Sequence, residues 1–96
     1  MLIELKKALL TARKDKDELK TSALTYLLSK IQNKEIELRA QKEELTNEHI
    51  EKVIRKQVKD LGKAIDMFEK GARQDLVDQN TEEKELLEEI LREHFE

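Results

Sequence analysis

The chain has 96 residues, of which 43% are charged and 3% aromatic, with two glycines and neither proline nor cysteine. Helices tolerate this composition, whereas sandwiches, barrels and Rossmann-like α/β units need β-branched and aromatic residues and Gly/Pro turns. Without cysteine the chain has no disulfide, thiolate metal site or cysteine nucleophile, and nothing indicates an oxidising compartment. We therefore expect one all-α domain, residues 1–96, in the cytoplasm.

The net charge of −3 conceals an uneven distribution along the chain. Residues 1–74 hold 17 Lys/Arg against 13 Asp/Glu, whereas residues 75–96 hold 2 against 9. No apolar run approaches the roughly 20 residues that span a bilayer, so no membrane segment is expected. The charge pattern predicts a molecule with a basic part and an acidic part.

Apolar residues recur every three or four positions in four stretches, which predicts four amphipathic helices. The expected ranges are 2–14, 16–42, 47–70 and 75–94. We expect them to form a small antiparallel bundle with 16–42 and 47–70 as a long central hairpin. The first and last helices would pack across that hairpin or against a partner chain.

Short polar segments between these stretches supply the expected helix ends. Asp15, Thr46 and Asp75 are the candidate N-caps of the second, third and fourth helices, because their side chains can accept from an unpaired amide. Gly71 is the expected left-handed residue that stops the third helix.

Catalytic and metal-binding patterns are absent from the sequence. The di-iron bundle motif needs a glutamate three residues before a histidine, but Thr46 precedes His49 and Leu91 precedes His94 at that spacing. The two glycines are too far apart to form a phosphate-binding loop. We expect no enzyme activity, no metal and no cofactor.

Basic residues form one stripe on the third predicted helix. They recur at i, i+3, i+4 and i+7, opposite the apolar face, so phosphates could bind along them. The alternative is an ordinary solvated face paired with neighbouring acids, since no aromatic residue is interleaved to stack bases. The acidic last helix is likewise expected to be solvated, or else to form a docking surface or cover the basic stripe. The candidate nucleic-acid-binding residues are Lys52, Arg55, Lys56, Lys59, Lys63 and, near the helix end, Arg73.

The segment Glu69-Lys70-Gly71-Ala72-Arg73-Gln74-Asp75-Leu76-Val77 resembles the YqeY family, which is related to the tail domain of the GatB subunit of the tRNA-dependent amidotransferase. Ser22-Ala23-Leu24 and Leu45-Thr46-Asn47-Glu48 fall in the same order and spacing. The resemblance runs to about residue 91. It implies a non-catalytic helical module that binds tRNA or an amidotransferase or synthetase component, at most as an accessory to carbon–nitrogen ligation with glutamine as amido donor.

Departures from the family pattern limit what carries over. Thr25 and Leu61 stand where the family has basic residues, and Arg92 stands where the family has a proline before a second small domain. We therefore expect the family's C-terminal domain to be absent, as in a divergent short member of bacterial or phage-like origin.

Two further alternatives remain open. Arg73 is either an RNA contact or a structural residue that pairs with Asp75 or other acids of the last helix. The whole protein is either the tRNA-associated module or a helical interaction adaptor without nucleic-acid binding, with a homodimer as one form. The expected partner seam of that adaptor consists of Val77, Leu91 and Phe95.

Overall fold

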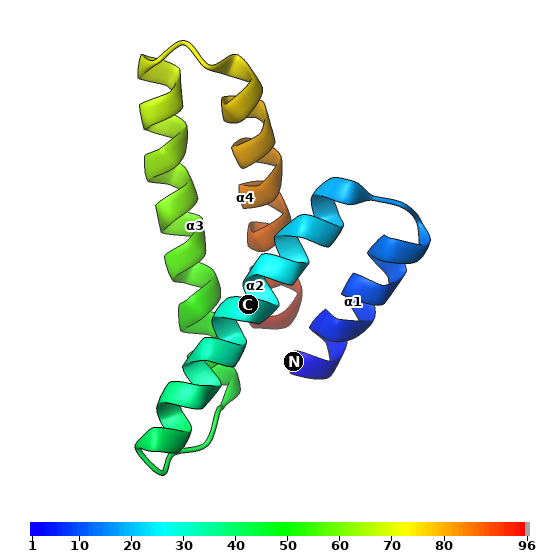
Figure 1. The fold of residues 1–96 in the computed structure, drawn as a ribbon, viewed down its shortest axis with the longest axis vertical. Coiled ribbons are helices and arrows are strands. Elements are labelled where there is room, and N and C mark those ends of the chain that lie inside the picture. The colour runs from blue at the N-terminus through cyan, green and yellow to red at the C-terminus, as the bar shows by residue number, and fades with distance from the viewer. Residues whose placement is uncertain (96) are drawn as a thin grey trace. The chain divides into compact units, whose positions relative to one another are not determined.

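The computed structural model describes residues 1–95, which form four α-helices and no strand (Figure 1). The helices are α1 (Leu2–Lys14), α2 (Glu18–Ala40), α3 (Asn47–Lys70) and α4 (Gln74–Phe95). The predicted all-α fold is confirmed, and no helix end differs from its predicted position by more than two residues.

The chain divides into two compact units, Met1–Val53 and the part from Ile54 onward, with the boundary inside α3. Each unit contains one helical hairpin. The expected central hairpin of α2 and α3 would span both units, so it stays a prediction, as does the expectation of a single domain.

The first unit is built on the pairing of α1 with α2, which lie alongside each other in Figure 1. The two helices run antiparallel (Figure 1). They line one hollow together, to which α1 contributes Leu2 and Leu9 and α2 contributes Thr25 and Glu35. Both contribute apolar side chains to the core at helical spacing, which removes these side chains from water and stabilises the pair. The buried residues are Leu5, Ala12, Ala23, Leu24, Leu27, Ile31 and Leu38.

The second unit pairs the remainder of α3 with α4, again as an antiparallel hairpin (Figure 1). The stem of Lys84 on α4 lies over Gly62 on α3, where Cε would be 4.0 Å from an added Cβ. Nearer the other end of α4, Arg92 lines a hollow with Arg55. The buried residues of this unit are Ile54, Leu61, Val77, Leu87, Ile90 and Leu91.

All three interhelical turns use a non-glycine residue in the left-handed conformation: Lys16 (φ 57°), Lys42 (φ 59°) and Ala72 (φ 56°). After each of them, the next amide donates to the carbonyl five residues earlier, which is the Schellman arrangement of a helix C-terminus. These bonds join Asp17 to Ala12 (2.9 Å), Glu43 to Leu38 (2.8 Å) and Arg73 to Phe68 (2.9 Å). The same device therefore reverses the chain three times.

The prediction that Gly71 is the left-handed residue is wrong. No glycine has a positive φ within residues 1–95, and Ala72 takes the left-handed position one residue later. Gly71 instead directly follows the last helical residue. A Cβ added to Gly71 would lie 3.6 Å from the carbonyl oxygen of Met67, which is an ordinary contact. Helix α3 still ends at Lys70, as predicted, and only the left-handed residue of the turn lies one position later than expected.

Of the predicted N-caps of α2 and α3, the one for α2 is wrong and the one for α3 is confirmed. Asp17, not Asp15, caps α2 by accepting from the amide of Lys20 at 3.1 Å, because Asp15 is taken up as the C-cap of α1. Thr46 precedes α3 as expected, and its Oγ1 accepts from the amide of His49 at 3.4 Å. Nδ1 of His49 in turn accepts from the Thr46 amide at 3.1 Å, so His49 fills the glutamate position of a capping box.

The left-handed conformation of Ala72 predicts the direction in which substitutions at Gly71 and Ala72 change the free energy of unfolding. A non-glycine residue in this conformation is strained, so Ala72→Gly should raise the free energy of unfolding by about 0.5–1 kcal/mol. Gly71→Ala should also stabilise, by about 0.4–1 kcal/mol, because its backbone accepts a side chain and alanine lowers the entropy of the unfolded chain. Urea denaturation of both variants measures this. A loss of stability in Gly71→Ala would place the strain at Gly71 instead.

Candidate nucleic-acid interface

The exposed face of α3 carries the basic stripe. Helix α3 is sharply amphipathic, with Ile54 and Leu61 buried on one side. The six candidate residues, five on α3 and Arg73 after it, are all exposed. Lys56, Lys59 and Lys63 follow one another at helical spacing, so they share one side of α3.

The stripe continues to the end of α3. Lys70 is exposed and lies two turns beyond Lys63, so the distance along the helix axis from Lys56 to Lys70 is about 21 Å at 1.5 Å per residue. Met67 lies between Lys63 and Lys70 and is 71% exposed. The surface is therefore a line of positive charge with one apolar side chain in it.

Several lysines of this surface are not paired with a neighbouring carboxylate. Lys56 forms an ion pair with Asp60 at 3.8 Å, but its side chain is 80% exposed, and a pair of that kind contributes little. Among residues 1–95, no carboxylate lies within ion-pair distance of Lys52, Lys59 or Lys63. The acidic helix α4 therefore does not cover the stripe.

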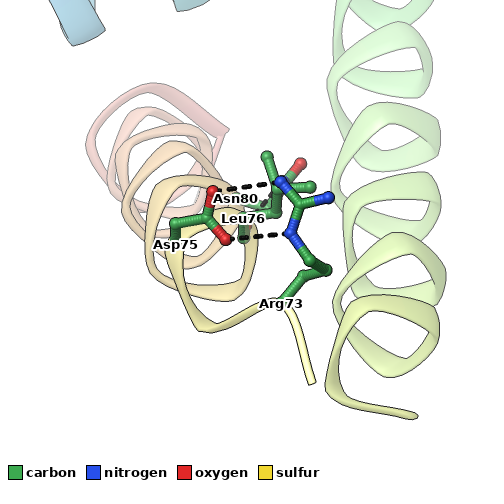
Figure 2. Close-up of polar contacts among 4 residues, drawn as sticks. All are labelled: Arg73, Asp75, Leu76 and Asn80. Carbon is green, nitrogen blue, oxygen red and sulfur yellow. Dashed lines mark hydrogen bonds and ion pairs between the residues drawn. The ribbon is translucent and has the colours of Figure 1, made fainter. Parts of the chain in front are cut away.

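Arg73 differs from the lysines because it already has a partner. Figure 2 shows its guanidinium facing Asp75 across the turn between α3 and α4. Nε donates to Oδ1 at 3.3 Å and a terminal nitrogen donates to Oδ2 at 3.2 Å. These hydrogen bonds lower the pKa of the Asp75 carboxyl, and the amide of Leu76 lowers it further. Pairing with Asp75 was one of the two roles considered for Arg73, and it is present here.

The predicted N-cap role of Asp75 is wrong. Helix α4 begins at Gln74, which places Asp75 in its first turn. The carbonyl of Arg73 accepts from the amides of Leu76 and Val77, so Arg73 occupies the cap position. A carboxylate in the first turn still interacts favourably with the positive end of the helix dipole. The side-chain Nδ2 of Asn80 donates to the backbone carbonyl of Leu76 at 2.7 Å, in the first turns of α4 (Figure 2).

A hollow of about 290 Å³ opens between α3 and α4 within the second unit. Val58 and Leu91 supply its apolar lining, and Arg55, Glu88 and Arg92 its charged lining. Spacing along α3 and α4 could not reveal this group, because it depends on the register between the two helices. The sequence had singled out Arg92 only for replacing a proline.

The predicted partner seam has little surface left. Val77 and Leu91 are both buried within the chain, and only Phe95 is partly exposed. The large apolar side chains that are exposed lie elsewhere, on α1, α2 and α3: Ile3, Leu10, Tyr26, Ile36 and Met67. The seam stays a prediction.

The described residues offer few other sites. Within residues 1–95, no three His, Asp or Glu side chains gather closely enough to hold a metal ion. None of the four helices combines the length and apolarity that crossing a bilayer requires.

These observations define a small all-helical module built from two hairpins, with a basic stripe on one helix. A family model described as Yqey-like protein matches residues 3–96. The chain therefore belongs to the YqeY-like family, and the match extends past residue 91, where the resemblance was expected to end. Membership supports a non-catalytic helical domain of the GatB/YqeY type. No curated protein matches the chain.

The Arg73–Asp75 pair leads to a prediction about pH. Because the pair lowers the pKa of Asp75, it stabilises the folded chain above the ordinary aspartate pKa, about 3.9, and this stabilisation is lost as pH falls through the lowered value. Asp75→Asn should therefore be less stable than the parent chain at pH 7, with the difference shrinking in acid. Urea midpoints from pH 7 to pH 2 test this, and a difference that is constant over the range would contradict it.

Proposed function

We propose that this protein is a non-catalytic tRNA-associated module that holds tRNA through the basic stripe of α3. It would serve as an accessory to a tRNA-dependent amidotransferase or synthetase, in which glutamine is the amido donor and the chemistry is carried out by another subunit. Its place of action would be the cytoplasm. The observation that carries this proposal is the exposed, largely unpaired row of lysines opposite the buried face of α3.

The form of the stripe suits a phosphate backbone. Lysines such as Lys59 and Lys63 act as point charges, which bind phosphate without reading sequence. No aromatic side chain lies in the stripe, so stacking on unpaired bases contributes nothing. The expected mode is therefore recognition of a folded RNA by its charge and shape.

A helical interaction adaptor is the second candidate. Ile3 and Leu10 lie seven residues apart on one side of α1 and are 66% and 64% exposed. Exposed apolar pairs of this kind favour a protein partner or a second copy. The basic stripe has no role in that alternative, so one experiment can separate the two functions.

The test is titration of labelled tRNA with the full chain at 50 and 200 mM salt. If about four phosphates are contacted, affinity should fall roughly 50- to 150-fold between these concentrations, because counterions are released on binding. The double variant Lys56→Glu/Lys59→Glu should bind more weakly, with a slope of log affinity against log salt reduced by about 2.

The matched control is Lys7→Glu/Lys14→Glu, which makes the same charge change at two exposed positions of α1. It should leave the affinity and the salt slope near those of the parent chain. No detectable binding near physiological ionic strength, or binding that survives reversal at Lys56 and Lys59, would contradict the proposal. Concentration-dependent self-association without RNA binding would favour the adaptor.

A further inference from the structure

Helix α2 carries the only tyrosine of the chain, Tyr26, on its surface. The side chain is 45% exposed, and Nζ of Lys30, one helical turn later, lies over the ring at 5.3 Å from its centroid. This cation–π contact holds an ammonium group beside an exposed aromatic face. Proteins that bind single-stranded nucleic acids combine the same two groups, because a base stacks on the ring while its phosphate meets the cation.

The surface around Tyr26 contains no acid. No Asp or Glu occurs from residue 19 to residue 34, although the chain has 22 of them. Ser22 and Ser29 are the exposed neighbours of Tyr26 one turn before and one turn after it. Asn33, one turn after Ser29, is exposed as well. These hydroxyl and amide groups can donate to or accept from a nucleotide, and none of them repels its phosphate.

The charge of Lys30 is not used by an ion pair. Among residues 1–95, no carboxylate lies within ion-pair distance of Lys30, whereas Lys34, the next lysine of α2, pairs with Glu37 at 3.5 Å. A cation–π contact at an exposed site is also weaker than the stacking of a base on the same ring. A base can therefore replace the ammonium group over the ring, and the flexible stem of Lys30 lets that group reach the phosphate of the same nucleotide.

We propose that Tyr26 stacks on one unpaired base of the bound RNA while Lys30 contacts the phosphate of that nucleotide. Helix α2 would then add a single-stranded contact to the charge contacts of α3. This proposal rests on the proposed function, because it needs an RNA partner. The stripe of α3 holds no aromatic side chain, so stacking has to come from another element, and a folded RNA offers unpaired bases in its loops.

The first experiment separates stacking from charge in the tRNA titration. Tyr26→Leu removes the ring but keeps an apolar side chain that suits a helix, so binding should weaken by roughly 5-fold or more with the salt slope unchanged. Tyr26→Phe keeps the ring and should bind like the parent chain. Lys30→Gln should lower the salt slope by about 1.

The matched control is Ile36→Ala, which removes another exposed apolar side chain from the same helix. It should change neither the affinity nor the salt slope. Equal affinities of Tyr26→Leu and Tyr26→Phe would overturn the proposal.

The second experiment observes the stacking position directly. Because the chain has no tryptophan, Tyr26→Trp introduces a single indole, which can be excited at wavelengths where RNA barely absorbs. Single-stranded oligouridylate should quench its fluorescence in a saturable way, and duplex RNA of the same length should not, because its bases are already stacked. Ile36→Trp places the same indole elsewhere on α2 and should not be quenched.

The two proposals fail separately in this experiment. If oligouridylate quenches the indole of Tyr26→Trp but tRNA does not bind, the proposed function is wrong and the stacking site stands. If tRNA binds through Lys56 and Lys59 and leaves that indole unquenched, the proposed function stands and the stacking site is wrong.

Discussion

Each helical hairpin depends on a chain reversal made without proline and without a left-handed glycine. Lys16, Lys42 and Ala72 adopt positive φ values instead, and each is held by the Schellman hydrogen bonds of the preceding helix. The short turns after α1 and after α3 return the chain antiparallel, which brings together the apolar faces of α1 and α2, and of α3 and α4. The helix pairing within each unit follows from the turns at Lys16 and Ala72.

Once the apolar faces are paired, the charged faces have to point outward. On α3 the exposed basic side chains outnumber the exposed acidic ones, whereas on α4 the exposed charged side chains are mainly acidic, so the two helices of the second unit differ in the sign of their net surface charge. Most acids of α4 are exposed, although burial raises the pKa of Glu83. Since no acidic side chain of α4 pairs with Lys52, Lys59 or Lys63, the stripe keeps a positive field, as the proposed binding of RNA requires.

Apolar periodicity was sufficient to predict the fold class and the helix bounds, because burial of one face dictates where a helix lies. It did not predict which polar residue caps a helix: Asp15 and Asp17 are equally suited by type, and the Schellman turn after α1 decides between them. Likewise, apolar periodicity did not predict that Ala72 rather than Gly71 takes the left-handed position after α3. The basic stripe lies within one helix and was therefore predictable, whereas the grouping of Arg55 with Arg92 requires the register between α3 and α4.

The claim that tRNA lies along α3 is tested most directly by protection of lysine amines from acetylation, read by mass spectrometry with and without tRNA. Lys56, Lys59 and Lys63 are exposed in the free chain, as are Lys7 and Lys14 on α1, so all five should react without RNA. We expect tRNA to slow acetylation of the three α3 lysines several-fold and to leave the two α1 lysines unchanged. Equal protection of both groups, or protection of α1 alone, would contradict the assignment of the RNA-binding surface to α3.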